Sequence, residues 1–200
     1  MRREDAVDAL RAGLPVILAS DTVYGLCASA ETAGPTERLY ALKGREADKP
    51  SALLAADVET LFACVPELNA AMGAIVRALL PGPYTLILPN PARRYGWLTG
   101  GTPEAIGVRV PVLPEASRRV LAPAGAVVST SANLAGGPDP RSVGEIALEL
   151  RERVAAIVDA GPLPGTPSTV LDLTGAEPRV LREGAVPAAE ALARAADALR

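Results

Sequence analysis

The sequence predicts an α/β fold in which a mixed β-sheet is flanked by helices. Short apolar runs typical of buried strands alternate with amphipathic segments typical of helices along the whole chain. Two pairs of expected strands have no helix between them, which favours a mixed sheet over a regular doubly wound one. The 200 residues, 49% of them hydrophobic, suit one domain with a substantial core. We therefore expect residues 1–200 to form a single domain.

Glycine, proline and aspartate mark the elements of the first half. An amphipathic helix stops at Gly13, and a second helix opens at Pro35 and ends at Gly44. Asp57 is a suitable helix cap, and the longest helix is halted by residues 81–83, Pro-Gly-Pro. The expected helices cover residues 4–12, 35–43 and 66–80, and the expected strands cover residues 14–19, 52–56 and 84–88.

The second half begins with an irregular loop at residues 89–103. Pro114 opens a short helix, and the four residues from Ser142 to Glu145 match a capping box for a helix that reaches about Arg153. The expected strands cover residues 105–110, 125–128, 155–158, 168–173 and 179–182, and a closing helix covers residues 188–199.

The composition excludes several kinds of site. The chain has no histidine, which excludes a Ser-His-Asp or Cys-His nucleophile and a histidine general base. Cys27 and Cys64 lack C-x-x-C spacing, and two cysteines suit a reducing cytosol. A net charge of −3 and 3% aromatic residues provide neither a general attraction for nucleic acid nor a stacking platform. A charged N-terminus and the absence of a long apolar window favour a cytoplasmic protein without a membrane span.

Two polar stretches follow apolar runs. Residues 129–133, Ser-Thr-Ser-Ala-Asn, come after the run 125–128, at the kind of strand end where α/β sheets bind ligands. Residues 20–26 follow another run; there Thr22 could bind a polar ligand and Tyr24 could form the wall of its pocket. A polar turn in the first case, and a turn with Tyr24 in the core in the second, explain the two stretches equally well.

Cations stand at two informative places. Lys43, Arg45 and Lys49 lie in and after a helix end, where cations are common, but a tight loop and the guanidinium also suit phosphate. Arg109 interrupts an apolar strand, and a buried arginine needs an anionic partner from the protein or from a ligand. An edge strand with Arg109 in solvent is the alternative. Arg182 ends the last expected strand.

Taken in order, these motifs resemble the YrdC-type family, the threonylcarbamoyl-AMP synthases of tRNA modification. The resemblance covers nearly the whole chain and includes the signature pair K-x-R and S-x-N, at residues 43–45 and 131–133. The matching segments are residues 20–26, 43–45, 81–85, 107–111, 129–133, 168–170 and 181–184. The resemblance implies a twisted, mostly parallel sheet around a deep, positively lined cavity, in a short form that has the catalytic domain only.

The resemblance also implies a reaction. The amino group of L-threonine takes up bicarbonate, and the resulting carbamate attacks the α-phosphate of ATP, giving threonylcarbamoyl-AMP and pyrophosphate. A separate transferase complex then modifies tRNA. Mg²⁺ is expected to arrive on the phosphates of ATP, and we expect the loop at residues 89–103 to close the cavity.

By position, the resemblance assigns two groups of residues. The residues implied for L-threonine are Thr22, Arg109 and Ser129, with the threonine carboxylate on Arg109. The residues implied for ATP are Arg45, Lys49, Ser131, Arg182, Ala105 and Asp139. Lys43, Arg45, Ser131 and Asn133 form the implied catalytic signature. At Ala105 some relatives have a threonine, so only backbone contact is left. At Asp139 a carboxylate replaces a serine and would repel phosphate unless it binds Mg²⁺.

Two other functions stay open. The first is a module that binds double-stranded RNA or tRNA through a patch of Lys43, Arg45, Lys49, Arg93 and Arg94, although the acidic pI and few aromatic residues disfavour strong binding. The second is a carbamoyl-handling domain related to hydrogenase maturation. Such domains are normally embedded in longer chains with zinc-finger-like cysteines.

Overall fold

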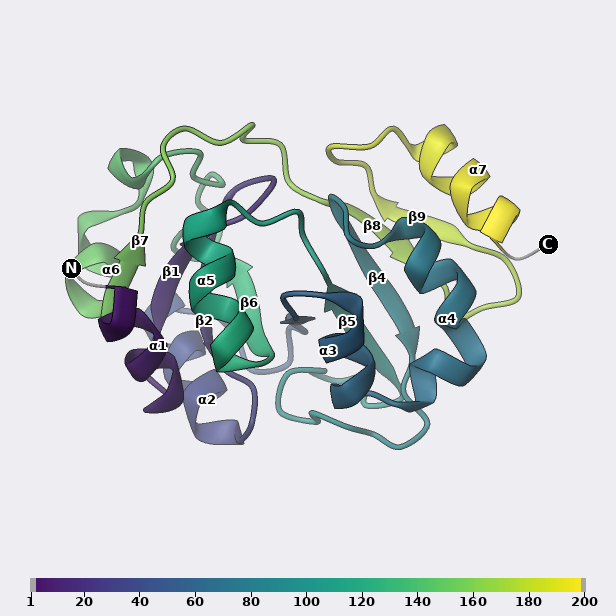
Figure 1. Ribbon diagram of the computed structural model, residues 1–200, viewed down its shortest axis with the longest axis horizontal. Coiled ribbons are helices and arrows are strands. Elements are labelled where there is room, and N and C mark those ends of the chain that lie inside the picture. Colours follow the sequence, from purple (N-terminus) through teal and green to yellow (C-terminus); the bar gives the residue numbers. More distant parts are fainter. Residues whose placement is uncertain (1–2, 199–200) are drawn as a thin grey trace.

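The computed structural model describes residues 3–198, in which nine strands form one sheet (Figure 1). The strand order is β7-β1-β2-β6-β3-β5-β4-β8-β9. The strands are β1 (Val16–Ala19), β2 (Tyr24–Ser29), β3 (Ala52–Leu54), β4 (Tyr84–Pro89), β5 (Ala105–Arg109), β6 (Val127–Ser131), β7 (Ala156–Val158), β8 (Thr169–Asp172) and β9 (Arg179–Arg182). The helices are α1 (Arg3–Arg11), α2 (Ala33–Lys43), α3 (Val58–Cys64), α4 (Glu67–Leu79), α5 (Glu115–Ala124), α6 (Leu148–Arg153) and α7 (Ala188–Ala198). Leu199, the last residue of the predicted closing helix, lies outside the described residues.

The predicted mixed α/β sheet is confirmed, but the expectation that it is mostly parallel is wrong. Among the described strands, five neighbouring pairs are antiparallel, and three pairs, β1–β7, β3–β5 and β4–β8, are parallel. The consecutive strands β1–β2, β4–β5 and β8–β9 are joined without a helix between them. A parallel pair needs a crossover connection, whereas a direct return produces an antiparallel pair.

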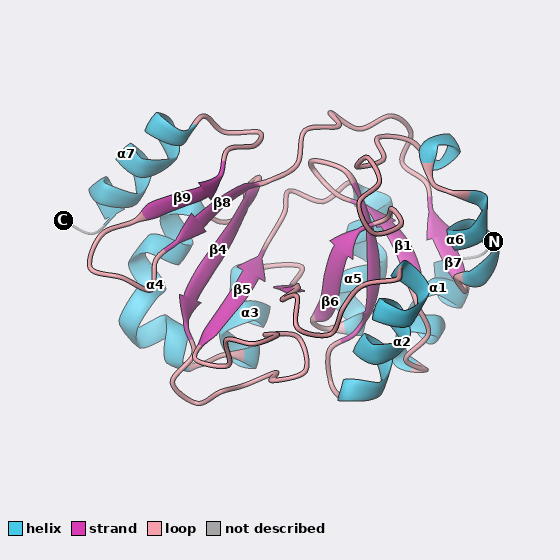
Figure 2. Ribbon diagram, turned by 180° about the vertical axis from the view of Figure 1, so that it is seen from behind, coloured by secondary structure: helices cyan, strands magenta, loops and turns pink. Residues whose placement is uncertain are grey.

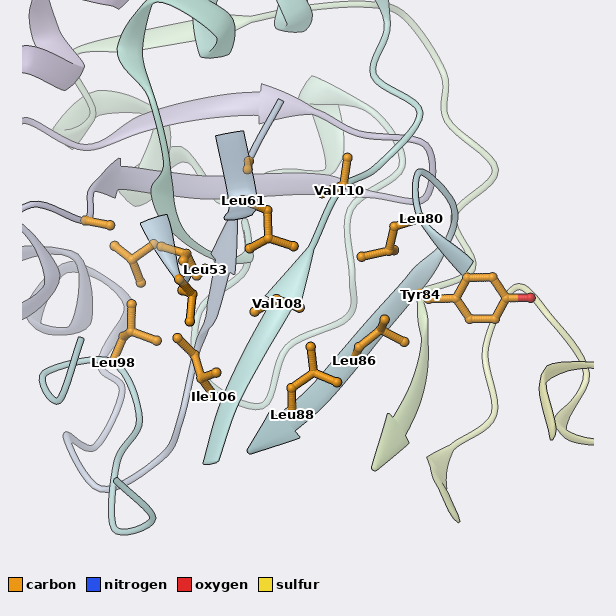
Figure 3. Packing of buried hydrophobic residues seen from close by; sticks show 14 of the residues in the cluster. Leu53, Leu61, Leu80, Tyr84, Leu86, Leu88, Leu98, Ile106, Val108 and Val110 are labelled. Atoms are coloured by element: carbon orange, nitrogen blue, oxygen red, sulfur yellow. The ribbon is translucent and has the colours of Figure 1, made fainter. Parts of the chain in front are cut away.

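Alternation along the central strands separates the core from an opposite, partly open face. In β5, Ile106 and Val108 are buried, whereas Ala105, Gly107 and Arg109 are only partly buried. Strand β4 repeats this pattern, and its leucines pack with Ile106, Val108 and Leu61 of α3 (Figure 3). Helices α3 and α4 lie on this apolar side of the sheet (Figures 1 and 2). The other face of β4 and β5 is left for the site.

Helices cover both faces of the sheet near β1. Leu10 of α1 and Val120 and Leu121 of α5 form a second core cluster with residues of β1, β2 and β6. Helix α2 packs on β2 from the opposite side, with Leu39 fully buried. Figures 1 and 2 show α5 and α2 on opposite sides of these strands. The described part of the chain contains no helix that is long and apolar enough to cross a membrane.

Two local predictions need correction, and one strand was not predicted. Strand β6 continues through Ser131, because residues 127–131 pair with β2, which the sequence did not predict as a strand. The capping box at residue 142 is wrong: Ser142 makes no side-chain cap, and a 3₁₀ turn (η1, Val143–Glu145) is separate from α6. The carboxylate of Glu145 instead accepts a hydrogen bond from Arg141 N at 2.8 Å.

Candidate active site

A cavity of about 360 Å³ lies on the partly open face of the sheet. A volume of a few hundred Å³ is typical of a small-molecule pocket. Its lining comes from strands that are far apart in the sequence. The strands contribute mainly alternate residues, because successive side chains point to opposite faces of the sheet. The predicted site residues in its lining are Arg45, Ala105, Arg109, Ser129, Ser131, Asp139 and Arg182.

Arg109 stands in this cavity with a partner from the protein. Its Nη2 lies 3.2 Å from Asp21 Oδ1 and donates to Thr22 Oγ1 at 3.2 Å. The second oxygen of Asp21 accepts from Val112 N at 3.0 Å. Strand β5 pairs with β3 and β4, so the alternative of an edge strand is wrong. The anionic partner that the sequence required is Asp21, which the sequence analysis did not identify.

The Arg109–Asp21 pair is largely removed from water. Burial raises the pKa of the Asp21 carboxyl, and this effect exceeds the opposing effect of Arg109. Burial likewise lowers the pKa of Arg109, against the attraction of Asp21. Nε of Arg109 is buried and has no hydrogen-bond partner. An unmet buried donor is costly. Arg109 also lines the cavity, where a guanidinium is suited to a bound anion.

Thr22 and Tyr24 lie behind the cavity instead of in its lining. Thr22 is fully buried, and its hydroxyl lies 3.0 Å from Ser20 Oγ. Tyr24 is also buried in the core, as the alternative interpretation held, and its hydroxyl donates to Asp159 Oδ1 at 2.7 Å. Thr22 therefore acts on the site through the Arg109 guanidinium that it contacts.

Ser129 lies beside a cavity residue that the sequence analysis missed. Cys27 Sγ is 3.5 Å from Ser129 Oγ, and burial raises the pKa of the Cys27 thiol to about 11. The thiol is therefore neutral at physiological pH. A Cβ at Gly25 would lie only 3.2 Å from Ser129 Oγ. Cys27 and Cys64 are both free thiols.

Lys43 lies in a hollow that adjoins the cavity, and it holds the S-x-N element, residues 131–133, in place. That hollow is lined by Lys43, Arg45, Lys49, Ser131 and Asn133, among others. The Lys43 ammonium donates to Ser131 O at 2.6 Å, to Asn133 O at 2.9 Å and to Asn133 Oδ1. Asn133 Oδ1 also accepts from Ser131 Oγ at 2.8 Å. Because an ammonium has three N–H donors, these contacts use all of them.

The environment of Lys43 lowers its pKa to about 8. Burial is the main cause, and the nearby Arg45 cation adds to it, whereas Asp139 opposes it. Asp139 Oδ1 is 3.5 Å from the amide nitrogen of Asn133. The K-x-R and S-x-N elements, 88 residues apart, thus form one hydrogen-bonded unit.

Arg45 and Lys49 provide the more accessible cations of this hollow. Arg45 donates through Nη2 to Pro50 O at 2.6 Å, which leaves other guanidinium donors available. Lys49 pairs with Glu46 at 2.7 Å, and both side chains are largely exposed. An exposed pair of this kind is weak, so Lys49 can exchange its partner for a ligand phosphate.

Arg182 lies at the β8 side of the cavity. It donates to Ser168 O at 2.8 Å and to Ser168 Oγ at 3.2 Å. Ser168 in turn shares a 2.8 Å hydrogen bond with Thr85 of β4. Thr85 and Ser168, which also line the cavity, add hydroxyls there. The structure thus brings cations to two sides of one cavity, around a row of small hydroxyl side chains.

A sequence model of the Sua5/YciO/YrdC family, described as "Telomere recombination", matches residues 8–184. The chain belongs to this family. A threonylcarbamoyl-AMP synthase of Pyrococcus abyssi is 32% identical over 186 residues, which cover 92% of this chain and 54% of that protein. A threonylcarbamoyl-AMP synthase of Halorhodospira halophila is 35% identical over 157 residues, which cover 78% of this chain and 82% of that protein.

A solved structure of this family agrees with the fold. The crystal structure of P. abyssi Sua5 complexed with L-threonine has a TM-score of 0.84 and 31% identity, covering 94% of this chain and 55% of that chain. The chain therefore spans about half the length of these P. abyssi proteins. The resemblance to the YrdC-type family that the motifs predicted is confirmed.

Alternation along β4 could have indicated Thr85, which the sequence analysis did not assign to this Sua5/YciO/YrdC site. Thr85 lies between the buried residues Tyr84 and Leu86, whereas β2 gives no such signal for Cys27, because Leu26, Cys27 and Ala28 are all buried. A polar or small residue at every second position is the signature of a half-open face. Asp21 had no such signal, because it lies between strands and meets Arg109 only through the fold.

Proposed function

We propose that this chain is an L-threonylcarbamoyladenylate synthase. It converts L-threonine, bicarbonate and ATP into threonylcarbamoyl-AMP and pyrophosphate, and a tRNA threonylcarbamoyl transferase complex uses the product. The observation that carries this proposal is the placement of two kinds of cation in adjoining hollows. The nearly buried Arg109 guanidinium lines one hollow, and a group of cations at the signature residues lines the other. Relatives named threonylcarbamoyl-AMP synthase support it.

The threonine carboxylate binds at Arg109. Arg109 lines the cavity, and in a site shielded from water a charged hydrogen bond is strong. Ser129 lies in the same cavity and contacts the amino acid, while Thr22 and Asp21 keep Arg109 in place. Residues 1–200 act as the catalytic domain.

ATP binds with its phosphates toward Arg45, Lys49 and Ser131, and Arg182 faces it from the other side. Ala105 contributes a small side chain to the wall. Mg²⁺ enters on the phosphates of the nucleotide, where it is usually bound. Asp139 is the cavity carboxylate closest to the signature residues, and its oxygens suit Mg²⁺ as a ligand.

Ser131 and Arg45 line both hollows, so the two substrates meet beside them. The carbamate oxygen attacks the α-phosphate there, the bond to the β-phosphate oxygen breaks, and pyrophosphate leaves. The residues align the reactants and neutralise the developing charge, which requires no histidine base. Lys43 and Asn133 act by holding Ser131 in position.

Two cations of the alternative RNA-binding patch are engaged. Lys43 is 4% exposed, and Arg94 forms an ion pair with Glu67 at 2.8 Å. These contacts favour a small-molecule site over direct binding of tRNA or double-stranded RNA, and we place the enzyme in the cytoplasm with its tRNA-modifying partners.

The test of this function is to follow bicarbonate into the product. The purified chain is incubated with L-threonine, ATP, Mg²⁺ and ¹³C-bicarbonate, and the nucleotides are analysed by mass spectrometry. We expect a threonylcarbamoyl-AMP ion that is heavier by one mass unit than the ion formed with ordinary bicarbonate. An unlabelled product, or AMP alone, would contradict the proposal.

A further inference from the structure

The loop between β4 and β5, residues 90–104, lies against the loop that follows the K-x-R signature. Ser51 N donates to Leu98 O at 2.8 Å, and Gly101 N donates to Asp48 O at 3.2 Å. These two backbone hydrogen bonds fasten both ends of the segment 48–51. Two segments far apart in the sequence are thus joined at the rim of the cavity, which Ser51 and Thr102 both line.

This loop is itself firmly anchored. Leu98 is fully buried and belongs to the same core cluster as Leu53 and Ile106 (Figure 3). The side chain of Asn90, 1% exposed, donates to the carbonyls of Arg94 and Pro103, both at 2.9 Å. A loop with a buried side chain and a closed base is suited to support its neighbour.

Segment 48–51 in turn holds Arg45. The guanidinium donates to Lys49 O at 3.4 Å and to Pro50 O at 2.6 Å. It also lies 5.9 Å from the centre of the Tyr40 ring, and the Tyr40 hydroxyl is 3.0 Å from Ser51 Oγ. A displacement of this segment therefore moves the carbonyls that orient Arg45.

Gly100 permits the close approach of the two loops. Its φ is +61°, and a Cβ at this position would lie 2.2 Å from Asp48 O and 3.0 Å from Pro50 N. A Cβ cannot lie 2.2 Å from a non-bonded heavy atom. The clashing atoms belong to the backbone of segment 48–51 and cannot rotate away, so any residue larger than glycine at position 100 must push the two loops apart by roughly 1 Å.

The geometry points to Gly100 as a positioning residue for nucleotide binding. The 90–104 loop braces segment 48–51, and the segment sets where the Arg45 guanidinium meets the phosphates of ATP. At the proposed threonine end, the side chains of Arg109 and Ser129 contact Asp21, Thr22 and Cys27. The segment reaches them through β3, which pairs with both of their strands, so we expect a smaller effect there. This inference rests on the proposed function, because it assigns Arg45 to ATP.

The experiment compares Gly100→Ala with Gly96→Ala, a matched change in the same loop where an added Cβ meets nothing within 4 Å. ATP and L-threonine affinities are measured separately by calorimetry. We expect Gly100→Ala to weaken ATP binding by about tenfold to hundredfold, the effect of a misplacement of about 1 Å, and to weaken L-threonine binding far less. Gly96→Ala should change neither affinity. Emission from Trp97, the one tryptophan, reports whether the loop has moved.

The outcomes separate this inference from the proposed function. Wild-type protein that binds neither ATP nor L-threonine would contradict the function itself. Wild-type protein that binds both, with unchanged ATP affinity in Gly100→Ala or an equal loss of both affinities, would overturn the brace. Should Gly100→Ala fail to fold, Asn90→Ala releases the other end of the same loop, and the same selective loss of ATP affinity is required.

Discussion

Arg109 and Asp21 are the residues on which the proposed threonine end of the cavity depends. Each side chain is only 12% exposed, and they lie 3.2 Å apart. A buried ion pair contributes little net stability, but loss of one partner leaves the other charge uncompensated. A simple alanine substitution at Arg109 would therefore combine a binding effect with a folding effect. Substitution of both residues separates the binding effect from the folding effect.

For Arg109→Ala we expect a lower melting temperature and at least about a tenfold loss of L-threonine affinity, because a charged hydrogen bond contributes about 1.5–3 kcal/mol. ATP affinity should be nearly kept. In Arg109→Ala/Asp21→Asn the unpaired carboxylate is removed, so the melting temperature should recover while threonine affinity stays low. Recovery of threonine binding together with stability would show that Arg109 is structural only.

We expect Lys43 to give the proposed ATP binding a pH dependence. Its pKa of about 8 lies below the ordinary value of 10.5, so the ammonium loses a proton as the pH rises through about 8. The neutral amine has one donor fewer for the carbonyls and amide at Ser131 and Asn133. We expect ATP affinity, measured without threonine, to fall between about pH 7 and pH 9.

The Lys43→Met variant is the control for this titration. It should bind ATP more weakly at neutral pH, because the signature unit has lost its central donor, and its affinity should show no inflection near pH 8. A wild-type affinity that is flat over this range would contradict the role given to Lys43.

At the scale of elements, most strands and helices could be predicted because apolar runs and stop signals are local properties. Strand β2 could not, since Gly25 and Cys27 are small or polar on the face that lines the cavity, and its place depends on pairing with β1 and β6. The capping box at Ser142 failed because the helix is broken at Ile146, whose backbone is extended.

The candidate site likewise combines features that are local in the sequence with contacts that only the fold creates. Arg109, the K-x-R element and the S-x-N element could be predicted from residue types and motifs. The partner of Arg109, the engagement of all three Lys43 donors and the contact between residues 48–51 and 98–101 could not, because each depends on side chains or backbone brought together by the fold.

The cap of α3 is a local prediction that the structure confirmed. Asp57 accepts a hydrogen bond from Thr60 N at 2.7 Å. We expect Asp57→Ala to lower the free energy of unfolding by about 1 kcal/mol, which lowers the melting temperature by roughly 2–4 °C in a domain of this size. Asp8→Ala, in an exposed 4.0 Å pair on α1, should change stability far less. Equal effects in denaturant unfolding would contradict the capping role.

At the scale of the whole molecule, one mixed sheet arranges two binding ends around a single cavity. The strands that present Arg109, Ser129 and Ser131 are neighbours or near neighbours in the sheet, although the chain visits them in a different order. Helices cover the opposite face and keep these strands rigid (Figures 1 and 2). Such a scaffold suits a reaction that depends on the alignment of two bound substrates.

Release of pyrophosphate from ATP tests this account most directly. The purified chain is assayed with Mg²⁺ and ATP, with L-threonine and bicarbonate each present or omitted. We predict release only when both are present, because the carbamate formed from them is the nucleophile. Release that is independent of L-threonine, or no release under any of these conditions, would contradict the assignment of the cavity to threonylcarbamoyl-AMP synthesis.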